Sequence, residues 1–256
     1  MQVLNSLSKL PANAAYDLVV IGAGGAGMAA ALFAAGFAVV MAAEVEESAP
    51  AVQAALHALP KARYLQHDLL GGDPAALLDA VGDVTCFVSN AGVPARQRGD
   101  MLALTAESFD HVMGINLRGA FFLAQEVARR MLAAPSAHYR SMLFVTSVSA
   151  QMISVERAEY CLSKSAAATM AQLFAVRMAP HGVGVFDLRP GIIDTAMTAA
   201  VHDKYSARIA EGLVPAQRWG LPAGIPIAGG GGDNAASAVG MGLVAPGQGF
   251  VSLGTS

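Results

Sequence analysis

Tyr160 and Lys164 are four residues apart in a segment, 159–179, whose pattern predicts a long helix. At that spacing both side chains lie on one face of the helix. A free tyrosine hydroxyl, with a pKa of about 10, is a poor acid or base at neutral pH, but a nearby ammonium group favours the phenolate and lowers that pKa. Ser147 follows a predicted strand, 142–146, and its hydroxyl can hold a carbonyl oxygen. These residues therefore predict a site that exchanges a proton with a carbonyl or alcohol oxygen.

A purely structural interpretation exists for each candidate residue taken alone. A tyrosine and a lysine on one helix are most often a packed ring beside a solvated ammonium group. Asn116 can be a satisfied polar residue within a helix, and Ser147 can cap one. Asp68 can cap the helix that follows it, and Asn90 can belong to a turn. The order and spacing of these residues along the chain favour the functional interpretation.

The elements that must bring these residues together alternate between short apolar runs and helical patterns. Strands are predicted at 17–21, 38–41, 63–65, 85–89, 142–146 and 184–188, and helices at 27–35, 51–59, 74–81, 108–132, 159–179 and around 204–213. β-rich runs separated by helices are typical of a parallel sheet covered on both faces. The pattern predicts a doubly wound, Rossmann-type α/β fold in a single domain over 1–256. Such sheets bind ligands beyond the carboxyl ends of their strands, where most of the candidate residues lie.

The composition disfavours several classes of protein. A chain of 256 residues, 54% of them apolar, can bury one large core. Its net charge of −3, with scattered positive charges, offers no footprint for nucleic acid or an anionic membrane. Cys86 and Cys161 fit a reducing compartment better than a disulfide scaffold. No metal site is expected, because the histidines show no ligand spacing: His57, His67, His111, His138, His181 and His202.

An uncharged stretch, 18–43, has the length and hydropathy of a membrane helix. Its glycines gather at two points, which favours a strand–turn–helix–turn–strand unit instead. They are Gly22, Gly24, Gly25, Gly27 and Gly36. The first residues of the chain lack the basic region and cleavable apolar core of a secretory signal. We therefore expect a cytoplasmic protein that does not bind a membrane.

Residues 36–222 resemble the short-chain dehydrogenase/reductase family in six motifs that occur in the family's order. Tyr160-Cys-Leu-Ser-Lys164 fits the family's Tyr-x-x-x-Lys, and Ser147 has the expected separation from it. Asn116, within Gly114-Ile-Asn-Leu-Arg-Gly119, fits the fourth catalytic residue. The resemblance implies that Asn116, Ser147, Tyr160 and Lys164 are catalytic, with Asn116 supporting a water-linked proton relay to the lysine.

The remaining motifs resemble the cofactor-binding segments of the same family. Ser89-Asn-Ala-Gly92 fits its Asn-Asn-Ala-Gly, Asp68-Leu69 fits the pair around the adenine ring, and Arg189-Pro-Gly-Ile-Ile-Asp-Thr195 fits the segment around the nicotinamide amide. The likeness is greatest to 3-oxoacyl-acyl-carrier-protein reductases, through Glu159-Tyr-Cys161 and Arg218-Trp-Gly220. The implied cofactor-binding residues are Gly22, Gly24, Gly27, Glu44, Asp68, Leu69, Asn90, Ala91, Gly92, Tyr160, Lys164, Pro190, Gly191, Ile193 and Thr195.

The resemblance implies an oxidoreductase that transfers hydride between NAD or NADP and a small alcohol or carbonyl substrate, such as a 3-oxoacyl thioester or a sugar. Glu44 is the best acidic candidate for the adenosine ribose, and no arginine or lysine lies near it in the sequence, which favours NAD. A homo-oligomer, dimer or tetramer, is also implied. A catalytically impaired nucleotide-binding module of the same fold is the alternative, and a flavin-binding protein is a third.

Two segments, 1–35 and 223–256, depart from this family. Gly22, Gly24 and Gly27 satisfy the general Gly-x-Gly-x-x-Gly fingerprint rather than the family's Thr-Gly-x-x-x-Gly-x-Gly. The run 16–32 resembles the FAD-binding start of a fumarate-reductase or ketosteroid-dehydrogenase type flavoprotein. The run 229–256 resembles a segment of a xylulokinase-type sugar kinase, in which Asp233 would match the catalytic base. We therefore expect a composite chain, with a reductase body between two foreign-looking ends.

Overall fold

Six parallel strands form the sheet that carries the candidate residues. The computed structural model describes residues 16–21, 37–192, 201–213 and 219. Within them the strands are β1 (Tyr16–Ile21), β2 (Phe37–Ala43), β3 (Arg63–Gln66), β4 (Cys86–Ser89), β5 (Arg140–Val145) and β6 (Val183–Leu188). Their spatial order is β3-β2-β1-β4-β5-β6, with every neighbouring pair parallel. This is the doubly wound order, and it confirms the predicted fold class.

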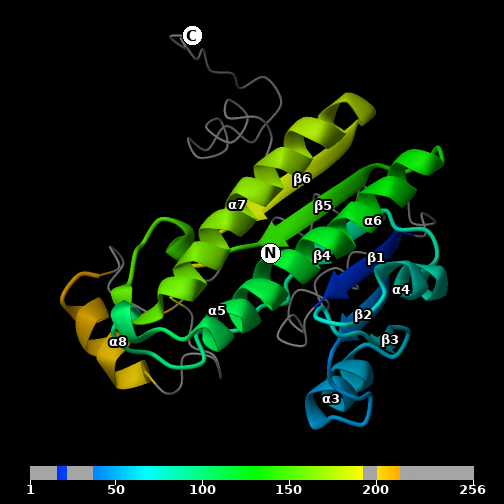
Figure 1. Cartoon of the computed structure of the whole chain (residues 1–256). Helices are drawn as coiled ribbons and strands as arrows, with labels where there is room; N and C mark the ends of the chain where they lie inside the picture. The colour runs from blue at the N-terminus through cyan, green and yellow to red at the C-terminus, as the bar shows by residue number, and fades with distance from the viewer. Residues whose placement is uncertain (1–15, 22–36, 193–200, 214–218, 220–256) are drawn as a thin grey trace, which may run out of the picture.

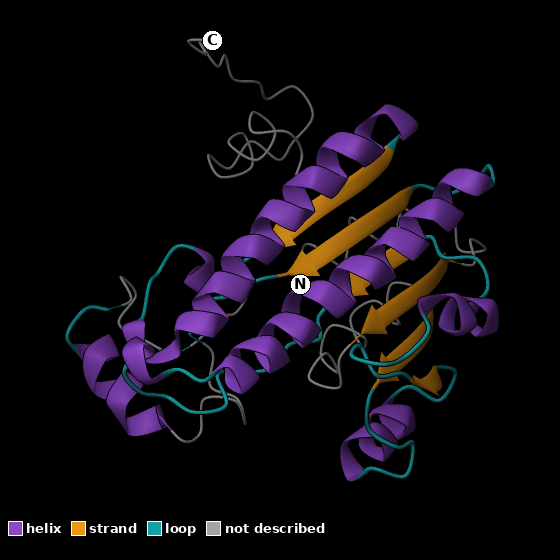
Figure 2. Cartoon of the chain, in the orientation of Figure 1, coloured by secondary structure: helices purple, strands orange, loops and turns teal. Residues whose placement is uncertain are grey.

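The described helices lie across the sheet and at its edges. They are α3 (Pro50–Ala58), α4 (Pro74–Val81), α5 (Ala106–Met113), α6 (Ala120–Ala133), α7 (Ala158–Met178) and α8 (His202–Ala210). α4, α6 and α7 lie side by side over one face of the strands, and α8 lies near the N-terminal end of α7 (Figures 1 and 2). The predicted helix 27–35 lies outside the described residues.

Local sequence signals set the ends of the helices. Asp73 caps α4, because its carboxylate accepts a hydrogen bond from the Ala75 amide at 2.9 Å, and Pro74 occupies the first turn. α4 ends at Gly82, whose φ of 91° lies in the region that glycine adopts most readily. Thr105 caps α5 in the same way through the Ser108 amide. The cap at Asp73 thereby fixes the end of the loop that joins β3 to α4.

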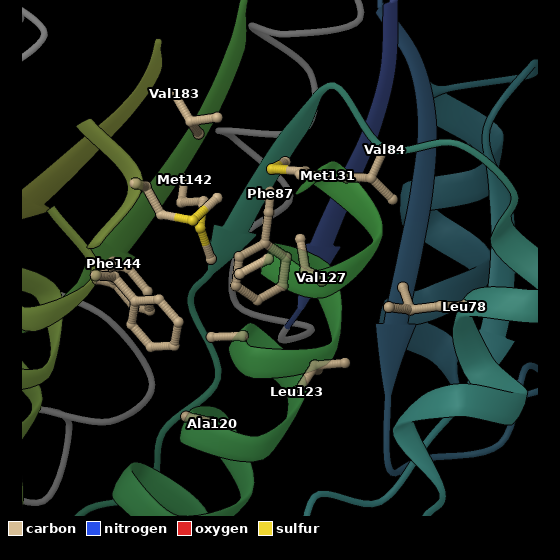
Figure 3. Close-up of a cluster of buried hydrophobic side chains, with 14 of the residues drawn as sticks. Leu78, Val84, Phe87, Ala120, Leu123, Val127, Met131, Met142, Phe144 and Val183 are labelled. Carbon is tan, nitrogen blue, oxygen red and sulfur yellow. The ribbon is translucent and has the colours of Figure 1, made fainter. Parts of the chain in front are cut away.

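The core has one layer on each face of the sheet. Phe87 and Val88 are successive residues of β4, so they point to opposite faces, and both are fully buried (0% exposed). Figure 3 shows the larger layer, where Phe87 and Phe144 of the strands meet Leu123 of α6. Each such side chain, when fully buried, contributes roughly 1.5–3 kcal/mol to the free energy of unfolding. Both faces of the sheet are thus covered at its centre, as the apolar runs predicted.

The uncharged stretch 18–43 is not one helix, because β1 takes its first residues and β2 its last. Among the helices that the structure describes, none combines the length and the apolar character that crossing a bilayer requires.

The helix predicted over 108–132 has a π-helical segment, Gly114–Gly119, between α5 and α6. Close contacts with the loop after β3 accompany it. A Cβ at Gly119 would lie 2.3 Å from the backbone oxygen of Leu69, and a Cβ at Gly114 would lie 2.7 Å from the Leu70 side chain. π-helical turns inside α-helices are frequent at functional sites, and this one carries Asn116.

We predict that Gly119→Ala lowers the free energy of unfolding by about 1–3 kcal/mol, because the added methyl group has no space against the Leu69 backbone. Urea denaturation followed by circular dichroism measures the change. Gly99→Ala is the matched control, since a Cβ there meets nothing within 4 Å. A Gly119→Ala protein as stable as the wild type would contradict the close packing of this segment.

Candidate active site

The predicted catalytic residues meet at the carboxyl ends of β4 and β5. β5 ends at Val145 and is followed at once by Ser147, while Asn90 follows β4. α7 passes in front of these strand ends and brings Tyr160 and Lys164 to them (Figure 2). The site lies on the edge where such sheets bind ligands, as expected from the fold.

Lys164 is a buried cation held against the sheet. Its side chain is only 5% exposed, and Nζ donates a hydrogen bond of 3.1 Å to the backbone oxygen of Val145. Burial lowers the pKa of Lys164 to about 8, and the nearby Asp187 carboxylate acts in the opposite direction. Gly92 packs beside the ammonium group, since a Cβ there would lie 3.3 Å from Nζ. The lysine therefore links α7, β5 and the loop after β4.

Tyr160 differs from the sequence-based expectation in the direction of its pKa. We expected Lys164 to lower it, but burial of the hydroxyl raises the pKa of Tyr160. A hydrogen bond with Ser147 and the positive charge of Arg157 act in the opposite direction and do not outweigh burial. The Lys164 ammonium group lies 5.9 Å from the ring centroid. Tyr160 is thus a protonated hydroxyl at neutral pH, placed to donate a proton.

Ser147 makes the cap that was weighed from the sequence as its structural role, and its hydroxyl also contacts Tyr160, while its predicted role in holding a carbonyl oxygen stays a prediction. Its Oγ accepts a hydrogen bond from the Ser149 amide at 3.0 Å, which caps a short 3-10 turn, Val148–Ala150. The same side chain hydrogen-bonds to Tyr160. Ser147 is buried, so the cap fixes its hydroxyl beside the tyrosine.

Asn116 uses its amide to hold other elements together. Its Oδ1 accepts from the Val93 amide at 2.8 Å, and its Nδ2 donates to the Val93 carbonyl at 3.0 Å and to the Ser163 hydroxyl at 3.0 Å. The side chain is 3% exposed. These bonds tie the loop after β4 to α7 across the π-helical segment. The predicted water-linked relay through Asn116 stays a prediction.

A cavity of about 480 Å³ lies beyond the carboxyl ends of β2 and β3. Glu44, His67 and Asp68 line it, and its size suits one half of a dinucleotide. His67 is buried, its Nε2 has no hydrogen-bond partner among the described residues, and burial lowers its pKa, so the ring is neutral. A neutral imidazole beside two carboxylates fits the adenosine end of a dinucleotide. Leu69 lines a neighbouring cavity of about 460 Å³ instead.

The other predicted cofactor residues divide into two groups. Asn90, Ala91 and Gly92 follow β4, and Gly92 packs beside Lys164. Pro190 lies beside the serine, because its carbonyl accepts a hydrogen bond from the Val148 amide at 2.9 Å, and the exposed Gly191 follows it. The rest lie outside the described residues: Gly22, Gly24, Gly27, Ile193 and Thr195. Within the described residues no group of His, Cys, Asp or Glu side chains is arranged to hold a metal ion.

Four residues of the site were not singled out from the sequence. Asp187 accepts a hydrogen bond from the Thr146 hydroxyl and forms an ion pair with Arg189. Its negative charge acts to raise the pKa of Lys164. The Arg157 guanidinium carbon lies 5.4 Å from the centroid of the Tyr160 ring. Ser163 and His67 complete the set. Ser163 adjoins Lys164 in the motif and Arg157 is one turn before Tyr160, whereas no sequence signal marks Asp187 or His67.

A family model described as short chain dehydrogenase matches residues 18–206. The chain belongs to the short-chain dehydrogenase family. In this short-chain dehydrogenase, Ser89 stands where the family's Asn-Asn-Ala-Gly motif has its first asparagine, and it is buried at the end of β4.

Known relatives match just over half of this short-chain dehydrogenase. 3-Oxoacyl-(acyl-carrier-protein) reductase MabA of Mycobacterium tuberculosis is 34% identical over 142 residues, which are 56% of this chain and 55% of that protein. 2-Dehydro-3-deoxy-D-gluconate 5-dehydrogenase of Dickeya dadantii is 30% identical over 142 residues, which are 55% of this chain and 54% of that protein. The chain thus spans just over half the length of these curated relatives.

A solved structure matches more of the chain. The crystal structure of a 3-oxoacyl-(acyl-carrier-protein) reductase from Brucella melitensis in complex with NAD has a TM-score of 0.75 and 40% identity. The match covers 81% of this chain and 85% of that chain. The predicted resemblance to reductases of this kind is therefore confirmed at the level of sequence and fold.

We predict that Lys164→Met stabilises the cofactor-free protein by about 3 kcal/mol at pH 7, because the native lysine pKa of about 8 lies well below its ordinary 10.5. The unfolded state binds more protons between these two values, so wild-type stability rises with pH across that window. The gain from the substitution should therefore shrink from pH 8 to pH 10.5. Urea denaturation at pH 7 and pH 10 measures it.

Lys61→Met, at an exposed lysine, is the control and should change stability by less than about 0.5 kcal/mol. A Lys164→Met protein that is less stable than the wild type at pH 7 would show that the ammonium group is not penalised by burial.

Proposed function

We propose that the chain is an NAD(P)-dependent oxidoreductase that interconverts a carbonyl and an alcohol group on a small substrate. The substrate classes that we propose are 3-oxoacyl thioesters and sugar-like compounds. The observation that carries the proposal is the Tyr160 hydroxyl, protonated, hydrogen-bonded to Ser147 and next to the buried Lys164 ammonium group. The names of the two relatives support the same substrate classes.

The side chains of the chain divide the work of the reduction between them. The Ser147 hydroxyl binds the carbonyl oxygen of the substrate and holds it beside Tyr160. Tyr160 donates its proton to that oxygen as negative charge develops there, because its raised pKa keeps it protonated. The Lys164 ammonium group stabilises the phenolate that remains. Bound NADH or NADPH supplies the hydride for the carbonyl carbon.

Glu44, Asp68 and Leu69 are the residues that we propose for the adenosine end of the cofactor, with Gly22, Gly24 and Gly27 at its phosphates. Asn90, Ala91 and Gly92 adjoin the catalytic lysine, and with Pro190, Gly191, Ile193 and Thr195 they form the proposed nicotinamide end. Ser147, Tyr160 and Lys164 are the residues that we propose as catalytic, and Asn116, predicted together with them, is a positioning residue. Asn116 acts here by position, through the loop that holds Gly92.

The charges around the nucleoside cavity favour NAD over NADP. Glu44, Asp68 and Asp73 line it, and its lining contains no arginine or lysine among the described residues. The sequence also has no arginine or lysine between residues 10 and 60. A carboxylate accepts hydrogen bonds from ribose hydroxyls and repels a 2′-phosphate.

We predict that NADH binds at least about tenfold more tightly than NADPH, a difference of about 1.4 kcal/mol. A fluorescence titration of the purified full chain with each dinucleotide measures both affinities. Glu44→Gln should reduce the difference in affinity, because it weakens the binding of NADH and leaves the binding of NADPH unchanged. Glu47→Gln, at an exposed carboxylate outside the cavity lining, is the control. Equal affinities in the wild type would refute the preference.

We predict that Tyr160→Phe lowers kcat by about 100-fold or more, because it removes the proton donor, and leaves the affinity for NADH within about twofold. Loss of NADH absorbance with a panel of β-keto esters, 3-oxoacyl thioesters and sugars measures turnover. Tyr139→Phe, at an exposed tyrosine before β5, is the control. Full activity of Tyr160→Phe would disprove the assignment.

The same measurements separate the alternatives. Saturable NADH binding by the wild type without turnover across the panel would instead identify a nucleotide-binding module. Flavin absorbance of the purified protein would identify a flavin-binding protein.

We also propose a homo-oligomer in the cytoplasm. Leu162, Leu173 and Val176 are 53%, 62% and 78% exposed on α7, and exposed apolar side chains gathered on one helix are typical of an interaction surface. Both cysteines, Cys86 and Cys161, are free thiols, which supports a reducing compartment. Sedimentation of the purified chain tests the first proposal.

A further inference from the structure

We infer that Ser163 is a positioning residue that holds the Asn116 amide, and through it the loop after β4, in place beside Tyr160 and Lys164. The inference rests on the proposed function for its effect on turnover. Its structural basis is a short series of hydrogen bonds between buried groups, each of which has a defined direction.

The Ser163 hydroxyl has its donor and its acceptor role fixed. It donates its proton to the backbone oxygen of Tyr160 at 2.8 Å, one turn earlier in α7. Its lone pairs are therefore free to accept, and Asn116 Nδ2 donates to it at 3.0 Å. Ser163 is 0% exposed, so water cannot replace either partner.

The orientation of the Asn116 amide follows from the backbone of Val93. The Val93 N–H can only donate, so the atom that accepts from it at 2.8 Å is the amide oxygen Oδ1. Nδ2 then faces both the Val93 carbonyl and Ser163. Asn116 therefore connects the loop after β4 to α7, and Ser163 is the residue of α7 that makes this connection.

The loop held in this way reaches the catalytic lysine. Gly92 adjoins Val93, and a Cβ on it would lie 3.3 Å from Lys164 Nζ and 3.4 Å from Asn116 Oδ1. Loss of the Ser163 acceptor leaves Asn116 bonded to Val93 but not to α7. The loop and the helix that carries Tyr160 can then shift relative to each other, and a shift of about 1 Å in such a site lowers turnover by up to roughly 100-fold.

Helix stabilisation alone does not explain Ser163. Ser165 makes a comparable side-chain bond, with its Oγ donating to the Ala150 carbonyl at 2.8 Å, but it is exposed and has no hydrogen bond to Asn116. Ser165→Ala is therefore the matched control. It removes a hydroxyl from the same helix and leaves the hydrogen bond between Asn116 and Ser163 intact.

The test is a double-mutant cycle of Ser163→Ala and Asn116→Ala, with Ser165→Ala as control. We expect Ser163→Ala to lower kcat about tenfold to 100-fold and to change the affinity for NADH by less than about threefold. The double variant should be no slower than Asn116→Ala, because both substitutions remove the same hydrogen bond between Asn116 and Ser163. Ser165→Ala should keep wild-type kcat. Wild-type kcat in Ser163→Ala, or effects that multiply in the double variant, would overturn the inference.

A readout without turnover separates this inference from the proposed function. Hydrogen exchange of the Val93 amide reports on its bond to Asn116 Oδ1, and the Gly99 amide, which donates to the Glu156 carbonyl, is an internal reference. Ser163→Ala should speed exchange at Val93 about tenfold and leave Gly99 unchanged. If the wild type turns over no substrate but Val93 responds in this way, the proposed function fails and the positioning role stands. Unchanged exchange at Val93 overturns the positioning role.

Ser163→Cys covers the case in which Ser163→Ala does not fold. Its side chain has nearly the shape of serine, but sulfur is a weak acceptor for Asn116 Nδ2. Lower kcat with retained NADH affinity and faster Val93 exchange support the inference. Wild-type values for both contradict it.

Discussion

The contact between the Lys164 ammonium group and the Val145 carbonyl is the constraint on which the rest of the site depends. Burial of a cation is unfavourable, and here the depressed pKa records that cost. The apolar packing of α7 against β5 and β6 must offset it, which it does through side chains such as Met170, Phe174 and Met178. Once the lysine is fixed at the end of β5, Tyr160 is fixed one helical turn away. The serine that follows the same strand then meets the tyrosine without any further element.

The fold was predictable because its signals are local. β2 and β4 carry apolar runs with mostly buried residues, and the described helices, α8 included, lie within a few residues of the predicted ones. The residues proposed as catalytic could be named in advance because the motifs that carry them resemble those of a known family, and because Tyr160 and Lys164 share one helix while Ser147 follows one strand end. Asn116 comes from a different element, the π-helical segment, and reaches α7 through Ser163.

The parts that could not be predicted depend on burial and on contacts between distant segments. The pKa of Tyr160 rises because the completed fold removes water from its hydroxyl. A sequence motif gives the residue type but not its exposure to solvent. The π-helical segment has no signature in the apolar spacing, because its contact partner, Leu69, is distant in the sequence. His67 likewise becomes buried, with an Nε2 that has no partner among the described residues, only when β3 joins the sheet.

The close contact of Gly119 with Leu69 limits how this protein could be redesigned. The loop after β3, which lines the proposed nucleoside cavity, packs directly against the π-helical segment that carries Asn116. The proposed nucleoside site and the proton-transfer site are therefore in contact through this loop. An engineer who enlarges residues 68–72 to alter nucleotide choice would also displace the proton-transfer residues. Glu44 lines the same cavity but follows β2, and it is not among the nearest neighbours of Gly114 or Gly119. The preference proposed for Glu44 can therefore be altered without enlarging the loop that packs against the segment of Asn116.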